Sequence, residues 1–298
     1  MQCSSVADYR CPVCGSPLQL TVDEGTDSDV VEGVLDCACG RQWRIRDSIP
    51  DFTHPADLAP SDAEFRQKYD DTANRYDIGL DWLFNSFYED EETVRRDMVA
   101  LLDLHAGDRV LEVSCGTGKD SKHIIPQIGA SGTLHSLELS ISMLKIARQK
   151  LQGSATPIEY LVGNASYLPF PDGQFDAAFH FGGVNTFGEK RRAIAEMARV
   201  VRPGGKVVVG DESVAPWLYR RVYGRILRTA NPLYNHRPPM ELLPANAEAV
   251  CLRWILGNAF YLIEFRVGEA PPRVDLDLQI PGPRGGTLRS RYYGPPKA

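Results

Sequence analysis

The sequence predicts an α/β fold built on a parallel sheet, preceded by a small β-rich segment. Two observations predict the sheet: an aliphatic strand that ends in a glycine-rich turn, and an alternation of strands and helices over the next hundred residues. A third observation, two close cysteine pairs near the N-terminus, predicts the separate β-rich segment.

Composition narrows the class of protein. The chain of 298 residues is long enough for one large domain and a smaller one, and its formal net charge of -6 disfavours binding of a nucleic acid through its overall field. No apolar run approaches the roughly 20 residues that span a bilayer, and residues 1–10 lack the apolar core of a signal peptide. Seven cysteines without an export signal indicate reduced thiols or metal binding. We therefore expect a cytoplasmic protein that does not act at a membrane.

The central motif runs from Glu112 to Gly118. Residues 110–113 form a predicted strand buried on both faces, and Gly116 and Gly118 follow it. Glycines allow a sharp turn and let a ligand approach the backbone N–H groups closely. A helical pattern begins at about Ser121. Strand, glycine turn and helix in this order open a nucleotide-binding α/β unit.

Polar residues end the next two strands. Glu138 follows the second strand, residues 132–137, and an acid there accepts hydrogen bonds from both ribose hydroxyls of an adenosine-type ligand. Met143 lies early in the next helix, where adenine could rest on its thioether. Asn164 ends the third strand and could read the adenine edge with its amide.

The remaining signals complete the sheet. Residues 175–181 are predicted to form the fourth strand, and a helix over residues 189–201 leads into a fifth strand. The apolar runs at 250–256 and 259–267 flank Gly257-Asn258, which is typical of an antiparallel hairpin.

Together these motifs resemble class I S-adenosylmethionine (SAM)-dependent methyltransferases, of the kind that includes ubiquinone and menaquinone C-methyltransferases. The matching positions are Glu112, Gly116, Gly118, Glu138, Gly163-Asn164-Ala165, Leu168-Pro169-Phe170 and Arg199-Val-Val-Arg-Pro-Gly-Gly205. The resemblance implies a Rossmann-like seven-stranded methyltransferase sheet and SAM as cofactor. It places the cofactor site at Glu112, Ser114, Gly116, Gly118, Glu138, Leu139, Met143, Asn164, Ala165 and Phe181.

Two positions depart from the family pattern. Ser114 replaces the first glycine of the loop, and Asn164 replaces the common Asp. The serine adds only a hydroxymethyl group, and the asparagine keeps an acceptor while adding a donor. Both substitutions are therefore compatible with cofactor binding.

The chemistry requires little from the protein beyond positioning, because the donor is an activated sulfonium. Glu112 and the loop N–H groups are expected to bind the methionine ammonium and carboxylate. A general base is needed only if the acceptor must lose a proton, and His180 at the end of the fourth strand is the candidate. A lone histidine inside a strand is more often structural. Cys115 is interpreted as a small loop residue and not as a nucleophile.

The N-terminal cysteines form the pairs Cys11-Pro-Val-Cys14 and Cys37-Ala-Cys39, the ligand set of a zinc ribbon that binds Zn²⁺. The second pair has one intervening residue where the usual ribbon has two, so that Cys3 or a water could replace one ligand, or the metal could be lost. A closed four-thiolate site would be structural.

Residues 11–52 resemble a small zinc-ribbon family, in which Ser48 would be glycine. Members of that family occur alone as activators of methyltransferases and also fused in front of bacterial ones.

We expect four regions: a zinc-ribbon-like domain at 1–53, a linker and helical lid at 54–107, a methyltransferase domain at 108–270, and a C-terminal arm at 271–298. The lid helix is expected to begin with a capping box at Ser61–Glu64 and to carry an aromatic stripe that serves either the core or the cofactor site. Within the methyltransferase domain, the insertion 213–246 is expected to cover the acceptor, although its arginines and aromatics could equally form a solvated helix face.

The expected activity is SAM-dependent methyl transfer to a small-molecule acceptor, a metabolite or natural-product intermediate. The alternative is an rRNA or tRNA base methyltransferase whose ribbon recognises RNA. The acidic charge and the absence of an aromatic-flanked Asn/Asp-Pro-Pro-Tyr motif after the fourth strand argue against nucleic acid as a partner. A third hypothesis, a partner-docking ribbon with a vestigial catalytic half, is opposed by the intact loop and Glu138. The acceptor, the methylated atom and the oligomeric state stay open.

Overall fold

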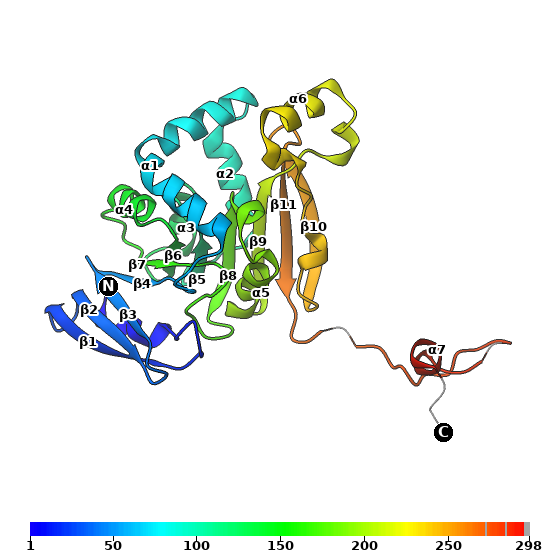
Figure 1. Cartoon of the computed structure of the whole chain (residues 1–298), viewed down its shortest axis with the longest axis horizontal. Coiled ribbons are helices and arrows are strands. Elements are labelled where there is room, and N and C mark those ends of the chain that lie inside the picture. Colours follow the sequence, from blue (N-terminus) through cyan, green and yellow to red (C-terminus); the bar gives the residue numbers. More distant parts are fainter. Residues whose placement is uncertain (272, 284, 295–298) are drawn as a thin grey trace.

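The computed structural model describes residues 1–271, 273–283 and 285–294. Within these residues, strands of the N-terminal segment and of the catalytic domain join in one 11-stranded sheet. Its order is β1-β2-β3-β4-β7-β6-β5-β8-β9-β11-β10, with the ribbon at one end and a long hairpin at the other (Figure 1).

The catalytic part of the sheet has the predicted order of elements. Its parallel strands β5, β6, β7, β8 and β9 are followed in space by β11, which is antiparallel to both β9 and β10. The elements are β5 (Arg109–Val113), α3 (Ser121–Ile128), β6 (Thr133–Glu138), α4 (Ile141–Lys150), β7 (Ile158–Gly163), β8 (Phe175–Phe181), α5 (Lys190–Val200), β9 (Val201–Glu212), β10 (Ala247–Ile255) and β11 (Phe260–Val267). The predicted fold class, a Rossmann-like α/β sheet with an N-terminal β-rich segment, is confirmed.

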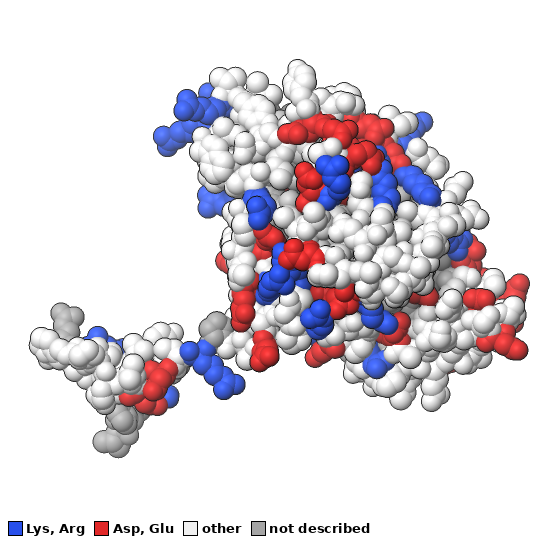
Figure 2. All heavy atoms as spheres, turned by 180° about the vertical axis from the view of Figure 1, so that it is seen from behind, with Lys and Arg blue, Asp and Glu red and all other residues white. Residues whose placement is uncertain are grey.

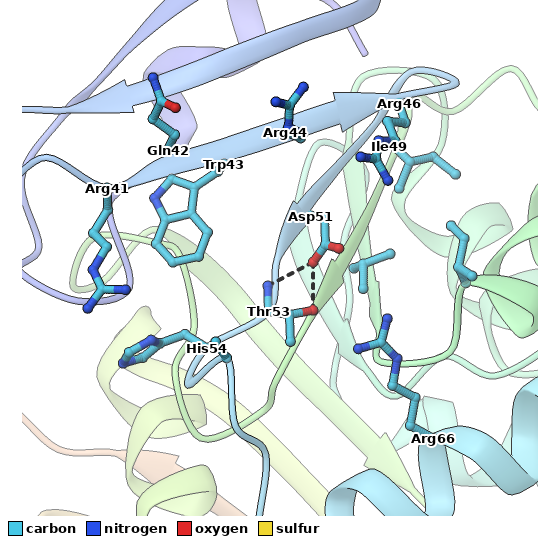
Figure 3. Close-up of a pocket in the computed structure, with 13 residues that line it drawn as sticks. Arg41, Gln42, Trp43, Arg44, Arg46, Ile49, Asp51, Thr53, His54 and Arg66 are labelled. Carbon is cyan, nitrogen blue, oxygen red and sulfur yellow. Dashed lines mark hydrogen bonds between the residues drawn. The ribbon is translucent and has the colours of Figure 1, made fainter.

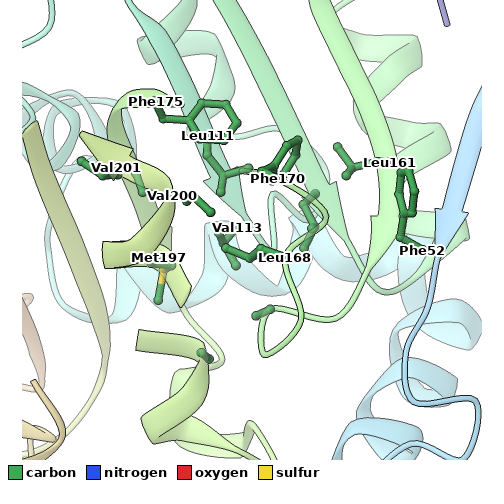
Figure 4. Close-up of a cluster of buried hydrophobic side chains, with 14 of the residues drawn as sticks. Phe52, Leu111, Val113, Leu161, Leu168, Phe170, Phe175, Met197, Val200 and Val201 are labelled. Carbon is green, nitrogen blue, oxygen red and sulfur yellow. The ribbon is translucent and has the colours of Figure 1, made fainter. Parts of the chain in front are cut away.

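Both faces of this sheet are covered, which explains why its strands read as continuous apolar runs. On one face, α2 (Glu91–Ala100) and α3 bury Met98 and Ile124 against the strands. On the other face, Met197 of α5 packs into a cluster that also contains Tyr9 and Phe52 from the N-terminal segment. Figure 4 shows the side chains of this second cluster lying along the strands. The hydrophobic core is therefore shared between the two predicted domains.

The N-terminal segment is an antiparallel ribbon that extends the catalytic sheet. Its elements are η1 (Cys3–Asp8), β1 (Leu18–Gly25), β2 (Val30–Cys37), β3 (Gln42–Arg46) and β4 (Ile49–Phe52). The last of these strands pairs in parallel with β7, with Asp51 opposite Val162 and Phe52 opposite Gly163. Ser48, which stands where the ribbon family has glycine, has a φ of 61°. This left-handed backbone is one that glycine adopts without strain, so the turn geometry survives the substitution.

The helical lid differs from its prediction at its start. Helix α1 (Pro60–Ser86) begins at Pro60, and its N-cap residue Ala59 offers no side-chain hydrogen bond, so the predicted capping box at Ser61 is wrong. Proline is favourable at the first helical position because its missing N–H would have no partner there. The helix runs over the catalytic sheet and packs against α4 (Figure 1).

The remaining segments lie at the far end of the sheet and beyond it. The insertion contains η3 (Pro216–Leu218), α6 (Val222–Ala230), η4 (Pro232–Asn235) and η5 (Met240–Leu242), and η2 (Val184–Thr186) follows β8. The predicted C-terminal arm extends away from the body and carries the short helix α7 (Leu288–Tyr293) (Figure 1). Among the described residues, no helix is long and apolar enough to cross a membrane.

Candidate functional site

The glycine-rich loop after β5 adopts the backbone that its sequence predicts. Ser114, Gly116 and Gly118 have φ angles of 56°, 55° and 78°. Ser114 therefore occupies the left-handed conformation that the family's first glycine would take without strain. At Gly118 an added Cβ would lie 3.2 Å from the Cβ of Ala147 on α4, so this glycine serves close packing between the loop and α4.

Glu138 closes the site from β6. One of its carboxylate oxygens accepts the N–H of Gly116 at 3.0 Å, and the other accepts the N–H groups of Leu139 and Ser140 at 2.8 and 2.9 Å. Burial raises the pKa of this carboxyl, whereas the backbone N–H groups oppose the rise. The carboxylate is thus fixed against the loop and keeps lone pairs for a ligand.

Two adjoining cavities, of about 150 and 70 Å³, lie at the carboxyl ends of β5, β6 and β8. Parallel sheets bind ligands at this edge. The predicted cofactor residues that line them are Ser114, Gly116, Glu138, Leu139, Met143 and Phe181. An added Cβ at Gly116 would lie 3.7 Å from the Met143 methyl carbon and 3.9 Å from the Tyr76 ring, so a side chain there would enter the space that a ligand needs.

Four other predicted cofactor residues lie outside this lining. Glu112 is buried beneath the loop, where it accepts a hydrogen bond from the Ser121 hydroxyl, and burial raises its pKa to about 8. The Asn164 amide accepts the N–H of Ser166 at 2.9 Å and donates to Asp62 at 3.4 Å. Ala165 is buried next to it, and Gly118 faces α4.

His180 is also kept away from the cavities. Its Nδ1 lies 2.9 Å from the carbonyl oxygen of Val113, and its ring packs on Phe187. The side chain is fully buried, and burial lowers its pKa. This geometry is typical of a structural histidine that ties β8 to β5, so its role as a base stays a prediction without support from the site.

Several residues that the sequence reasoning did not assign reach the cavities. Phe65, Tyr69 and Tyr76 form a roof from α1. At the floor, the Arg95 guanidinium contacts both oxygens of Asp120 at 2.8 Å, and both residues line the larger cavity. The aromatic stripe on α1 was visible in the sequence, but only packing shows which way it faces.

Glu212 is the most informative of these unassigned residues. It ends β9, lines the larger cavity, and has a pKa raised well above the ordinary value by burial and by the neighbouring carboxylate of Asp211. Asp211 itself accepts the N–H groups of Asn185 and Glu212. An acid at the end of a fifth parallel strand is the signal that could have identified it, by the reasoning that identified Glu138.

Acidic residues of α1 hold this roof over the loop. Asp77 accepts the Thr117 hydroxyl at 2.6 Å and also contacts the Lys150 ammonium. Asp70 accepts the Ser140 hydroxyl at 2.6 Å, at the start of α4. With α1 in this position, the cavities are smaller than the roughly 300–1,000 Å³ typical of ligand pockets. We infer that α1 moves when ligands enter.

The four predicted zinc ligands converge at the tip of the ribbon. The sulfur atoms of Cys11, Cys14, Cys37 and Cys39 all lie within 4.8 Å of one another. The Cys14–Cys37 and Cys11–Cys39 sulfur pairs are 3.4 and 3.8 Å apart, and tetrahedral Zn–S bonds of about 2.3 Å require sulfur separations of about 3.8 Å. The single-residue spacing of the second pair is thus compatible with a four-sulfur site that needs no ligand from Cys3.

Comparison with known proteins assigns the family. Residues 61–226 match the model of the ubiE/COQ5 methyltransferase family. The chain belongs to this family. Among relatives of the ubiE/COQ5 family, it is 34% identical over 175 residues to the demethylmenaquinone methyltransferase of Renibacterium salmoninarum, which covers 58% of this chain and 70% of the relative. It is also 34% identical over 117 residues to the ubiquinone/menaquinone biosynthesis C-methyltransferase UbiE of Francisella tularensis. This match covers 39% of this chain and 47% of the relative.

Membership of the ubiE/COQ5 family confirms the predicted class, a SAM-dependent methyltransferase, and supports a small-molecule acceptor. Solved structures agree on the fold. A chain of the complex between the Haloferax volcanii Trm112 methyltransferase activator and a methyltransferase is similar with a TM-score of 0.52 and 15% identity, covering 67% of this chain and 98% of that one. The [4+2]-cyclase SpnF gives a TM-score of 0.53 and 17% identity, covering 71% and 98%.

Proposed function

We propose that this ubiE/COQ5 family member transfers a methyl group from SAM to an apolar aromatic acceptor of the quinol class. Its relatives are named for demethylmenaquinone and ubiquinone/menaquinone biosynthesis. The observation that carries the proposal is the composition of the larger cavity. Glu212 lines it together with a mostly apolar wall of Phe65, Tyr69, Leu80, Leu83, Phe181, Leu233 and Phe260. A planar apolar ring with an ionisable hydroxyl fits such a lining.

The residues around the loop fit the donor. Glu138 would accept the ribose hydroxyls, and Met143 would lie against the adenine. Arg95 and Asp120 line the floor of the larger cavity as an ion pair, and the carboxylate and ammonium of the methionine end could exchange this pair for contacts with the ligand. When bound, SAM supplies the activated methyl group, and the chain's own residues supply position.

Glu212 is our candidate for the general base, in place of His180. A carboxylate at the acceptor side of the cavity would take the proton of the acceptor hydroxyl, which increases electron density on the ring. The raised pKa makes this carboxylate a stronger base than an exposed one, since a group that holds its proton tightly also removes one effectively.

We further propose that Zn²⁺ occupies the four-cysteine site and is structural. The sulfur separations fit tetrahedral coordination.

RNA recognition finds no support on the face of the molecule that Figure 2 shows. The face of the molecule opposite that of Figure 1 shows lysine and arginine side chains interspersed with Asp and Glu, and an acidic band crosses its upper part (Figure 2). A phosphate backbone would need a continuous basic surface there. We therefore propose a small-molecule acceptor.

The substitution Glu212→Gln tests the base. We expect methyl transfer to reduced demethylmenaquinone to fall by about 10²-fold or more, while SAM affinity measured by calorimetry stays unchanged. In the wild-type protein, the rate should rise with pH as Glu212 loses its proton, and this limb of the pH profile should disappear in the variant.

The variant His180→Asn serves as the comparison, because its side chain lies outside the cavities. A rate loss for His180→Asn that exceeds the loss for Glu212→Gln, with both variants folded, would reverse the assignment. Normal SAM binding without transfer to any reduced quinone would refute the acceptor class.

A further inference from the structure

A third cavity, of about 560 Å³, lies where the ribbon meets the catalytic sheet (Figure 3). Its walls come from β3 and β4, from the turn after β4, and from α1, α4 and β7. It is larger than the two cavities at the glycine-rich loop, and its volume lies within the range of small-molecule sites. None of the predicted cofactor or zinc residues lines it.

The charge of this cavity is strongly positive in a chain whose net charge is -6. Arg41, Arg44 and Arg46 line it from the ribbon, and Arg66 reaches toward it from α1 (Figure 3). The one carboxylate in the lining, Asp51, already accepts the backbone N–H and the hydroxyl of Thr53 at 2.9 and 2.6 Å. Four cations therefore face a single anion that is otherwise engaged.

The four arginines of this cavity differ from several other arginines of the molecule in having no carboxylate partner among the described residues. In the part of the chain that the structure describes, none of the four forms an ion pair, whereas Arg148, Arg202 and Arg253 pair with Asp47, Asp176 and Glu264. Unpaired guanidinium groups gathered at a concave site are exposed to mutual repulsion, which a bound anion would relieve. The nearby His54 has its pKa lowered by burial and then by Arg41 and Arg192, so its imidazole is neutral.

Apolar side chains also line the cavity. Ile49, Ile141 and Val162 form one wall, and Trp43, only 6% exposed, forms another. A ligand that fits would thus combine a charged end with an apolar part. The planar guanidinium forks match the geometry of phosphate oxygens, and several of them together suit two or three linked phosphates.

We propose that this junction cavity binds a small organic di- or triphosphate. The hollow shape favours a small molecule over a nucleic acid strand, which needs an extended basic track. The ligand would contact both the ribbon, through Arg41, Arg44 and Arg46, and the lid helix, through Arg66. Arg66 also lines the smaller cavity at Glu138, so one side chain borders both sites.

Calorimetric titration of the zinc-loaded full-length protein with inorganic diphosphate tests the site. We expect saturable binding to the wild-type protein. The double variant Arg44→Gln/Arg46→Gln and the single variant Arg66→Gln should each weaken it by about tenfold or more, because each removes charged hydrogen bonds. Arg75→Gln is the matched control, since Arg75 lies on α1, is exposed, and lines none of the three cavities.

Further outcomes decide against the proposal. Absence of diphosphate binding at millimolar concentration overturns it, and so does binding that all the variants retain. A single-stranded RNA oligonucleotide is titrated in parallel at physiological salt. RNA binding that the double variant abolishes, without any diphosphate binding, would assign the site to nucleic acid instead. Unchanged unfolding temperatures of the variants exclude misfolding as the cause of weaker binding.

Discussion

At the scale of single residues, Glu112 is a position of the cofactor motif whose side chain contributes to the stability of the fold. Its side chain lies beneath the loop with the Ser121 hydroxyl as partner, and burial raises its pKa from 4.5 to about 8. Between pH 4.5 and about 8, the Glu112 carboxyl therefore keeps its proton in the folded chain and releases it in the unfolded chain. Stability from this neutral carboxyl is complete below pH 4.5 and is lost as the pH rises through about 8.

The variant Glu112→Gln should remove this loss of stability at high pH. An amide does not titrate and can still accept the hydrogen bond from the Ser121 hydroxyl. We expect its unfolding temperature to match that of the wild type near pH 5 and to exceed it by several degrees near pH 9. Thermal unfolding followed by circular dichroism measures both. The exposed Glu64→Gln is the control, and an equal pH trend in all three proteins would contradict the buried titration.

At the scale of elements, α1 is the part of the site that we expect to move. Asp77 ties this helix to Thr117 in the loop and to Lys150 on α4. These contacts hold the roof over cavities that are too small for donor and acceptor together. If α1 opens, these contacts break, so we expect them to slow the release of a bound donor.

We expect Asp77→Ala to accelerate SAM release by about tenfold, since charged hydrogen bonds contribute roughly 1.5–3 kcal/mol each. Stopped-flow displacement of SAM measures the release rate. Asp71→Ala is the control, because Asp71 is exposed and its carboxylate accepts a hydrogen bond from Gln67 of the same helix at 2.9 Å. Identical release rates in the two variants would mean that α1 is not the gate.

The elements themselves were largely predictable. Strands such as residues 175–181 could be predicted because buried parallel strands are continuous apolar runs. Glu138 could be predicted as a site residue because it ends one of these strands. The direction in which each side chain points was not predictable from the sequence. His180 and Glu112 lie in strands whose neighbours decide whether a side chain meets a cavity or the core, and sequence spacing does not contain that packing.

At the scale of the whole molecule, ribbon and catalytic sheet share one core. Tyr9 packs on Phe52 and Phe170 with ring centroids 5.1 and 5.8 Å apart, and Asp8 contacts Arg109 at the start of β5. The boundary predicted at residue 53 thus marks the end of a strand without separating two cores. Unfolding of the ribbon should therefore destabilise the catalytic sheet.

Zinc removal tests this coupling. We expect one Zn²⁺ per chain by elemental analysis, and we expect Cys39→Ser to lose the metal and lower the unfolding temperature of the whole chain in a single transition. Cys3→Ser is the control, since Cys3 lies outside the four-sulfur cluster and should keep the metal. Two separate transitions after zinc removal would show that the ribbon unfolds alone.

The pairing of β4 with β7 has one more consequence. Without β4, β7 would be an edge strand of a parallel sheet, with a row of open N–H and C=O groups beside apolar side chains. Such an edge invites pairing with another copy and aggregation. The ribbon therefore covers this edge of the catalytic sheet through its last strand, which is only four residues long.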